Sequence, residues 1–164
     1  MLDWLAHRAN ISPQKTALIF GNRSWSYAAL NNLVGALAAK LAASGVTAGQ
    51  HVAVLLPNRV EFVTLIHALA RLNAVIVPLN IRLTETELSW QVDQSDSRFL
   101  ICDRETEPLA VELAGQVEQI LSVDTSAAVS SLIDIPAADA SLWQARLLNL
   151  DSLQGIIYTS GTTG

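Results

Sequence analysis

Residues 52–78 read VAVLLPNRVEFVTLIHALARLNAVIVP, and this stretch decides the fold. It begins with an apolar run at 52–56 and ends with a second apolar run at 75–77, and a proline closes each run. Between them, residues 59–72 carry apolar side chains at helical spacing around more than one face, so we expect a helix buried between other elements. Two buried strands joined by a helix predict a parallel βαβ unit.

Helix starts can be recognised at three places, because a side-chain oxygen there can accept a hydrogen bond from the first turn. The expected caps are Ser26 for a helix over residues 27–41 that ends before Gly45, Asn58 with Glu61 for residues 59–72, and Thr84 with Glu87 for a helix through Leu88 and Val92.

Shorter patterns predict a strand at 98–102, a helix at 108–117 and a strand at 119–123. Residues 124–145 are rich in Ala, Ser and Asp and read as a loosely structured connection that carries no chemistry. Short apolar runs that alternate with helices predict one domain of the α/β class, with a largely parallel sheet flanked by helices.

Composition excludes several classes of function. A net charge of -5, with only two lysines, offers no positive stripe for nucleic acid. Cys102 is the single cysteine and the three histidines lack ligand spacing, so no disulfide and no metal site are predicted, and a reducing cytoplasm fits. Neither a signal peptide nor an apolar run of about 20 residues is present, so no membrane span is expected.

The balance of charged and apolar residues suggests that part of the surface is covered by something else. Charged residues make up 15% of the chain, against roughly 25% in an average soluble domain. The mean hydropathy is +0.34. We therefore expect the isolated chain to self-associate.

The last apolar run, residues 155–158, predicts a short strand that leads directly into a loop of Gly, Ser and Thr. Such a loop can be an ordinary solvated turn, since these residues are common in turns. It can also be an anion cradle, because glycine lets backbone N–H groups converge on phosphate oxygens and hydroxyls add donors. A Walker A loop is excluded, because no lysine follows Gly161.

The sequence from Tyr158 through Gly164, YTSGTTG, resembles the signature of the adenylate-forming superfamily of AMP-binding enzymes, which includes the acyl-CoA synthetases. Residues 25–30 and 74–84 also resemble that family, so the likeness covers nearly the whole chain. Asn73 stands where the family usually has glycine, and asparagine tolerates a positive φ. Gln50 stands where the family usually has aspartate, which leaves a local turn contact open.

The resemblance implies a fold, a reaction and a site. The chain would be the amino-terminal subdomain of the large acyl-CoA synthetase domain. In the family, ATP and a carboxylic acid give an acyl-adenylate and pyrophosphate, with Mg²⁺ sharing the phosphate charge, and coenzyme A then takes the acyl group as a thioester. By this resemblance, the ATP phosphates would be bound by Thr159, Ser160, Gly161, Thr162, Thr163 and Gly164.

The family's motif normally continues beyond this loop, and its catalytic residues follow later in the chain. Residues 1–164 are therefore expected to be the amino-terminal part of an adenylation domain that is cut within the phosphate-binding loop and is inactive alone. No catalytic residue can be named among them.

The substrate is suggested by the first residues. The start of the chain, with Trp4-Leu5, Arg8-Ala9, Pro13 and then Ala17-Leu18-Ile19, resembles the o-succinylbenzoate-CoA ligases of menaquinone synthesis. Fatty-acyl-CoA ligases share most of this pattern and remain an alternative. A third alternative is a noncatalytic, naturally truncated module that binds a partner or a nucleotide without turnover.

Overall fold

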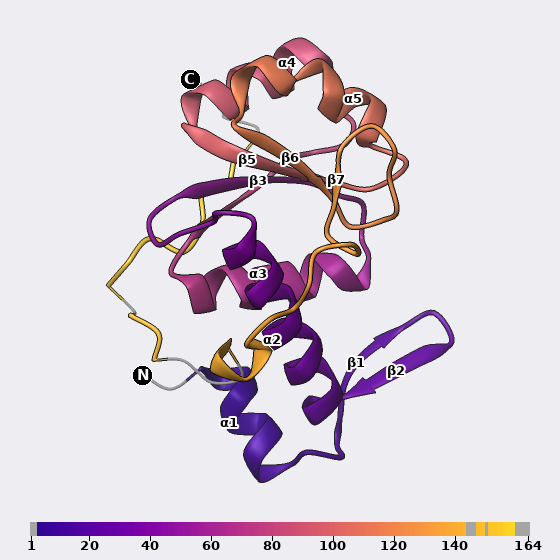
Figure 1. Cartoon of the computed structure of the whole chain (residues 1–164), viewed down its shortest axis with the longest axis vertical. Coiled ribbons are helices and arrows are strands. Elements are labelled where there is room, and N and C mark those ends of the chain that lie inside the picture. The colour runs from indigo at the N-terminus through magenta and orange to yellow at the C-terminus, as the bar shows by residue number, and fades with distance from the viewer. Residues whose placement is uncertain (1–2, 144–146, 150, 160–164) are drawn as a thin grey trace.

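The computed structural model describes residues 3–143, 147–149 and 151–159. Short apolar strands alternate with helices, as the sequence predicts (Figure 1). The strands are β1 (Thr16–Phe20), β2 (Arg23–Ser26), β3 (His51–Leu55), β4 (Val75–Pro78), β5 (Ser97–Cys102), β6 (Gln119–Ser122) and β7 (Ser130–Ser131). The helices are α1 (Trp4–Ile11), α2 (Tyr27–Ala43), α3 (Val60–Leu72), α4 (Glu85–Gln94) and α5 (Glu107–Glu112), with 3-10 turns η1 (Ala114–Gln116) and η2 (Ala140–Trp143).

The main sheet has the strand order β4-β3-β5-β6-β7, and each neighbouring pair is parallel. The chain passes from β3 to β4 in one direction and from β5 to β6 in the other, so the strand order reverses between β3 and β5. In doubly wound sheets the carboxyl ends of the two strands at such a reversal form a crevice that commonly binds ligands. The predicted α/β class with a largely parallel sheet is confirmed.

Alternation along the strands explains why both faces of the sheet are covered. Val52 and Val54 of β3 belong to the core beneath α2 and α3, whereas Ala53 and Leu55 belong to the core beneath α4 and α5. All four side chains are fully buried. Figure 1 shows the two helix pairs on opposite sides of the sheet. Successive side chains of a strand point to opposite faces, so a continuous apolar run needs a helical layer on each side.

Two of the three predicted helix caps are confirmed. The Ser26 hydroxyl accepts a hydrogen bond from the Ala29 N–H at 3.2 Å, and Thr84 forms the predicted capping box at the start of α4. The predicted cap at Asn58 is wrong, because α3 begins one residue later and its N-cap, Arg59, makes no side-chain capping bond. The Glu61 carboxylate instead accepts from Arg59 Nε at 2.7 Å.

The two departures from the family pattern are accommodated locally. Asn73 ends α3 in the left-handed conformation with φ 54°, which is the role expected of it. The Gln50 side chain closes its own turn, since its Oε1 accepts from the Thr47 N–H at 2.7 Å. The Gln50 amide, which is longer than the aspartate usual in the family, therefore makes the turn contact that the sequence analysis could not settle.

Two predicted stretches differ from the structure. The helix expected over residues 108–117 is shorter: α5 ends at Glu112, and the chain continues as η1, which contains Gly115. Glycine lowers helix stability, so a short 3-10 turn replaces the last turns. The connection at 124–145 is more ordered than expected, because it contains β7 and η2.

The sequence analysis missed α1 and the β1–β2 hairpin. The hairpin is an antiparallel ribbon in which Phe20 pairs with Arg23, so Gly21 and Asn22 form a two-residue turn. Gly21 has φ 60°, a conformation that glycine adopts readily. A Gly-Asn pair between two β-prone runs was the signal that could have located this hairpin.

Candidate functional site

The stretch that leads into the predicted phosphate loop lies beside β4. The Ile76 N–H donates to the Gln154 carbonyl at 3.1 Å, and the Ile156 N–H donates to the Ile76 carbonyl at 3.0 Å. These bonds form a single parallel bridge between Ile76 and Gly155. The strand expected over residues 155–158 is therefore wrong in extent, because only one residue pairs before Tyr158 turns to pack on α4.

Of the six residues predicted to bind phosphate, Thr159 is described, and it is exposed at the end of this stretch. The other five lie outside the described residues: Ser160, Gly161, Thr162, Thr163 and Gly164. Their assignment to ATP phosphates stays a prediction.

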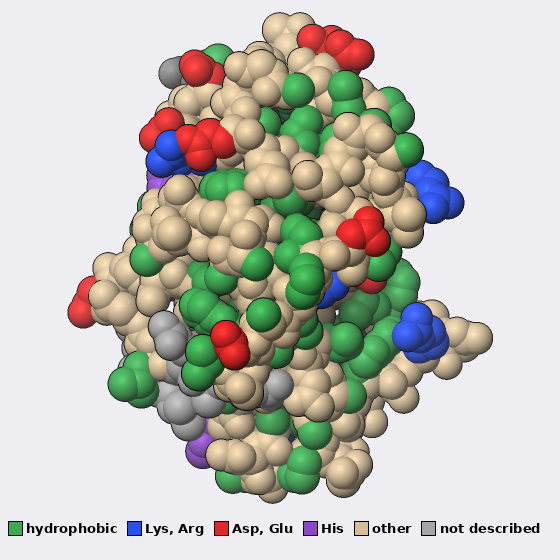
Figure 2. Space-filling model, viewed as in Figure 1, with side chains coloured by type: hydrophobic (Ala, Val, Ile, Leu, Met, Phe, Trp, Pro, Cys, Tyr) green, Lys and Arg blue, Asp and Glu red, His purple; other side chains and the backbone are tan. Residues whose placement is uncertain are grey.

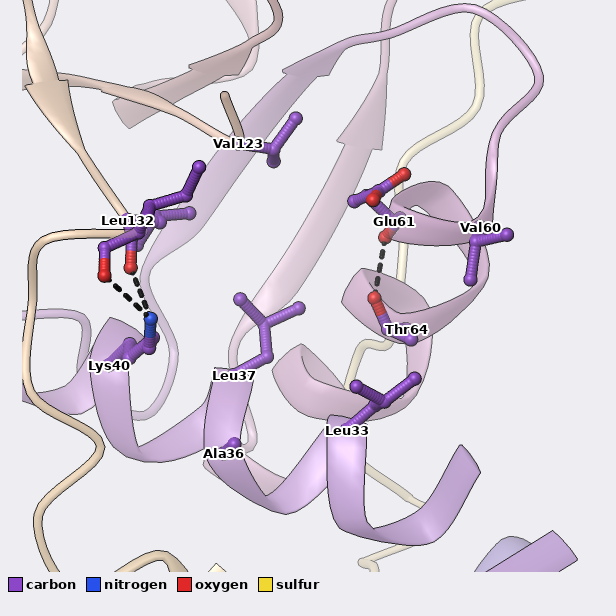
Figure 3. A pocket seen from close by; sticks show the side chains of 10 residues that line it. Leu33, Ala36, Leu37, Lys40, Val60, Glu61, Thr64, Val123 and Leu132 are labelled. Atoms are coloured by element: carbon purple, nitrogen blue, oxygen red, sulfur yellow. Dashed lines mark hydrogen bonds between the residues drawn. The ribbon is translucent and has the colours of Figure 1, made fainter. Parts of the chain in front are cut away.

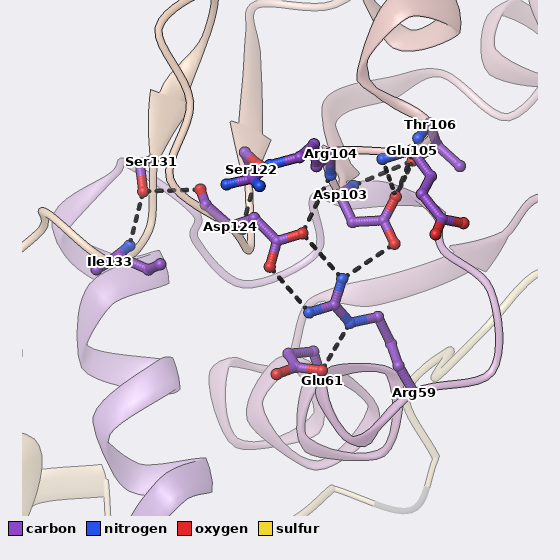
Figure 4. A network of polar contacts seen from close by, with 10 residues as sticks. All are labelled: Arg59, Glu61, Asp103, Arg104, Glu105, Thr106, Ser122, Asp124, Ser131 and Ile133. Carbon is purple, nitrogen blue, oxygen red and sulfur yellow. Dashed lines mark hydrogen bonds and ion pairs between the residues drawn. The ribbon is translucent and has the colours of Figure 1, made fainter.

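A polar cluster that the sequence analysis missed lies where the strand order reverses (Figure 4). Arg59, four residues after β3, places its guanidinium between Asp103, which directly follows β5, and Asp124, which lies two residues after β6. Nη1 donates to Asp103 at 3.0 Å and to Asp124 at 3.1 Å, and Nη2 donates to the second oxygen of Asp124 at 3.0 Å. Together with the bond from Nε to Glu61, four bonds hold the guanidinium.

The cluster ties the ends of three strands together. Asp103 also accepts from the N–H of Thr106 at 3.0 Å, and the Thr106 hydroxyl donates to the Leu55 carbonyl at 2.7 Å. Hydrogen bonds to Asp124 raise the pKa of Arg59 above its usual value, and the same bonds lower the pKa of Asp124. A cavity of about 360 Å³ adjoins Arg59, Asp103 and Asp124.

This arrangement makes Arg59 an internal clamp. Paired carboxylates use most of its donors, so the guanidinium has little capacity left to bind an external anion. One signal in the sequence could have revealed the cluster: charged residues follow the ends of three predicted parallel strands, and those ends meet at one edge of the sheet.

A second cavity, of about 290 Å³, lies between α2, α3 and residues 123–133 (Figure 3). Its wall is mostly apolar, and Leu37 points toward its centre. The Lys40 ammonium donates to the carbonyls of Leu132 at 2.6 Å and Ile133 at 3.2 Å. Lys40, the cation that lines this cavity, thus links residues 132–133 to α2. Because its ammonium is already bonded to these carbonyls, we assign no ligand to this cavity.

A buried ion pair lies at the other end of α3. Arg71 has no exposed surface and donates through Nε to Asp3 at 2.5 Å, through Nη2 to the Asn31 side chain at 2.5 Å, and through Nη1 to the Trp143 carbonyl at 2.7 Å. Burial lowers the pKa of Arg71, and the Asp3 carboxylate opposes that effect. These bonds join α1, α2, α3 and η2.

Three further features of the described residues bear on function. No three His, Cys, Asp or Glu side chains within residues 3–143, 147–149 and 151–159 gather into a group that could hold a metal ion. Cys102 is fully buried, and burial raises the pKa of its thiol to about 12, so it is not a reactive thiolate. No helix in the described part of the chain is long and apolar enough to cross a membrane.

Comparison with known proteins connects this geometry to a family. A family model described as AMP-binding enzyme matches residues 5–164. The chain is 39% identical over 164 residues to a protein named 2-succinylbenzoate–CoA ligase from Geobacillus kaustophilus, and it spans 31% of the length of that relative.

Solved structures are similar over the same region. The O-succinylbenzoate coenzyme A synthetase of Bacillus subtilis in complex with AMP is 34% identical, with a TM-score of 0.81, and the match covers 100% of this chain and 40% of that one. A complex of the same synthetase with ATP and a magnesium ion matches 80% of this chain and 36% of that one at 34% identity and a TM-score of 0.72. A Mycobacterium tuberculosis fatty acyl CoA synthetase is 30% identical, with a TM-score of 0.80, over 96% of this chain and 32% of that one.

The family model covers the chain from α1 through the Gly/Ser/Thr loop, and the parallel sheet with its two helical layers agrees with the solved relatives. The chain belongs to the AMP-binding enzyme family.

Proposed function

We propose that this chain is the amino-terminal part of an AMP-forming ligase that activates o-succinylbenzoate with ATP and transfers it to coenzyme A in menaquinone synthesis. The observation that carries the proposal is the 39% identity over the whole chain to a 2-succinylbenzoate–CoA ligase. The chain spans 31% of that relative, so the activity belongs to a longer protein. The acid pocket and the catalytic residues would lie in that remainder.

The contribution of this chain would be to hold the ATP phosphates. The proposed donors are the backbone N–H groups and hydroxyls of Thr159, Ser160, Gly161, Thr162, Thr163 and Gly164. Fixed donors around the β- and γ-phosphates stabilise the charge of the leaving pyrophosphate while the substrate carboxylate attacks the α-phosphorus. Mg²⁺ would share that charge, and the complex of a relative with ATP and magnesium supports its inclusion.

The remaining partners and the compartment are also proposals. Coenzyme A would accept the acyl group as a thioester, as the ligase name of the relative implies. A cytoplasmic location fits a chain whose single cysteine is a buried thiol. The charge pattern argues against nucleic acid as a partner.

An assay of the complete protein tests the proposal directly. Purified enzyme is supplied with ATP, Mg²⁺, coenzyme A and a panel of carboxylic acids, and pyrophosphate release and thioester formation are measured. We expect o-succinylbenzoate to give the highest kcat/KM. A preference for long-chain fatty acids would favour the second candidate, fatty-acyl-CoA ligase, which the similarity to the Mycobacterium tuberculosis synthetase supports.

The gene sequence distinguishes the noncatalytic alternative from the proposed enzyme. In the family that this loop resembles, the motif normally continues with one variable residue and then Pro-Lys-Gly, so we expect the reading frame to continue in the same way after the codon for Gly164. A stop codon at that point would support a truncated binding module and contradict the proposed enzyme.

A triple substitution tests the loop itself. In the complete enzyme, changing Thr159, Ser160 and Thr162 to alanine is expected to slow adenylation far more than transfer from preformed acyl-adenylate, because pyrophosphate has left before the second step. Equal losses in both half-reactions would show that the loop serves folding rather than phosphate binding.

A further inference from the structure

Tyr158, the residue before the predicted loop, is anchored in the protein, whereas its neighbour is not. Ile156 and Tyr158 pack against the core beneath α4 and α5. Ile157 between them points outward and is 75% exposed. The chain therefore enters the loop from a position that the side chain of Tyr158 helps to set.

Tyr158 contacts α4 in two ways. Its hydroxyl donates to the Gln91 carbonyl at 3.1 Å and also lies within hydrogen-bond distance of Gln94 Oε1. Its ring meets Trp90 edge-on, with ring centroids 5.8 Å apart and an interplanar angle of 62°. Edge-to-face aromatic pairs are attractive, and a half-buried tyrosine hydroxyl normally finds a polar partner.

The surface that receives Tyr158 is itself firmly held. The capping box of Thr84 and Glu87 fixes the first turn of α4. Leu88 and Val92, on the inner face of α4, are 0% and 1% exposed. Gln91 and Gln94 thus belong to a helix that is fixed at its start and along its buried side.

Close packing at Gly155 fixes where this stretch lies along β4. A Cβ atom at Gly155 would lie 3.2 Å from both Cγ2 and the carbonyl oxygen of Ile76. Contacts this short to a backbone atom are not relieved by a side-chain rotation, so a larger residue would push the stretch away from β4. Gly155 and Tyr158 therefore hold the approach to the loop at two points, three residues apart.

We propose that Tyr158 is a positioning residue for ATP binding, which holds the start of the phosphate loop against the last turn of α4. This inference rests on the proposed function and adds to it a residue outside the Gly/Ser/Thr loop. A donor displaced by even about 1 Å loses much of its value for catalysis, so the anchor should affect ATP binding and adenylation more than later steps. If Tyr158 only filled the core, its hydroxyl would not matter to ATP.

The test compares Tyr158→Phe with Tyr27→Phe in the complete enzyme. Both changes remove one hydroxyl, but Tyr27 lies at the start of α2, where its ring contacts Arg8. We expect Tyr158→Phe to raise the KM for ATP about three- to tenfold, the effect of one lost hydrogen bond, and to leave transfer from preformed acyl-adenylate unchanged. Tyr27→Phe should change neither value. An unchanged KM for ATP in Tyr158→Phe, or equal losses in both half-reactions, would overturn the inference.

A binding measurement separates this inference from the choice of substrate. Because Trp90 contacts the Tyr158 ring, its fluorescence should change when ATP and Mg²⁺ bind, even without turnover. Trp90→Phe should abolish the change, whereas Trp4→Phe, at an indole that is 58% exposed, should keep it. Tyr158→Phe should move the midpoint to about three- to tenfold higher ATP. If the enzyme is inactive toward every acid but Tyr158→Phe still shifts the midpoint, only the proposed reaction is contradicted. If Tyr158→Phe leaves the midpoint unchanged, or if Trp90 fluorescence does not respond to ATP, the positioning role of Tyr158 is contradicted.

Discussion

Asn73 shows how one residue can satisfy a backbone requirement at a cost. It ends α3 with φ 54°, in the left-handed region that glycine adopts with the least strain. Its side-chain oxygen is buried and has no hydrogen-bond partner among the described residues. Asparagine therefore supplies the turn but leaves a polar atom unsatisfied.

We predict that Asn73→Gly stabilises the chain. The substitution removes the buried, unpaired amide oxygen and the strain of a left-handed non-glycine residue. These gains outweigh the extra flexibility of glycine in the unfolded state, so we expect the free energy of unfolding to rise by about 1 kcal/mol. Urea denaturation at neutral pH measures the change. Asn73→Ala is the control, since it removes the amide but keeps the strain. A glycine variant no more stable than the alanine variant would contradict the argument.

The Arg59 clamp should make stability depend on pH. Bonds from Arg59 lower the pKa of Asp124, so this carboxylate stabilises the fold above its unfolded pKa of about 4, and the contribution disappears as the pH falls through the lowered folded value. Asp124→Asn should therefore cost about 1 kcal/mol at pH 7, allowing for solvent screening, and progressively less below about pH 4.

Urea denaturation from pH 3 to pH 7 checks this dependence. Glu118→Gln is the matched control, because Glu118 pairs with Arg98 and both side chains are 50% exposed. We expect this variant to differ little from the parent at any pH. A cost for Asp124→Asn that stayed constant across the range would show that the effect is not electrostatic.

At the scale of elements, the helix caps that depend only on neighbouring residues were predicted correctly, and the cap that depends on distant residues was not. The caps at Ser26 and Thr84 were correct because a capping hydroxyl acts within three residues. The cap predicted at Asn58 was wrong because the Glu61 carboxylate bonds to Arg59 instead. The position of Arg59 in turn depends on Asp103 and Asp124, which lie far along the chain.

The bonds of Arg71 to Asp3, Asn31 and Trp143 join four elements, so their loss should be costly. Asp3 also caps α1, since one oxygen accepts from the Leu5 N–H at 2.9 Å while the other accepts from Arg71. Arg71→Met would leave this carboxylate buried without its cation. We predict a loss of about 3 kcal/mol in the free energy of unfolding.

Arg98→Met is the matched control, because Arg98 is half exposed and its pair with Glu118 contributes little. We expect a change of less than about 0.5 kcal/mol for this variant. Chemical denaturation of both variants gives the comparison. Similar small losses in the two would mean that the buried pair does not hold α1, α2, α3 and η2 together.

At the scale of the whole molecule, large apolar side chains reach the surface in many places, and Figure 2 shows hydrophobic side chains spread over one face. Those at least 60% exposed are Ile19, Trp90, Leu142, Leu147 and Ile157. Ile157 and Leu147 lie near the carboxyl-terminal side of the described chain, where the solved relatives continue. This distribution agrees with a surface that further protein would cover.

We predict that the 164-residue chain self-associates or binds a hydrophobic dye at micromolar concentration. Burial of apolar surface contributes roughly 25 cal/mol per Å², so a few hundred Å² left open would favour association by several kcal/mol. Light scattering and dye fluorescence measure the two effects, and Ile157→Ser should weaken both. If the chain stays monomeric and binds no dye, the exposed apolar side chains do not form a surface that drives association, and the prediction is contradicted.

The sequence by itself determined the fold class, most of the strands and helices, and the family. Apolar periodicity and capping act over a few residues, and the YTSGTTG motif is contiguous, so both can be read along the chain. Only the tertiary structure revealed the Arg59 clamp, the buried Arg71 pair and the docking of Tyr158 on α4. Each of these joins residues at least 40 positions apart, and their meeting depends on how the strands are ordered in the sheet and how the helices pack on it. Pairing of that kind is fixed by the packing of whole elements, which no short stretch of sequence records.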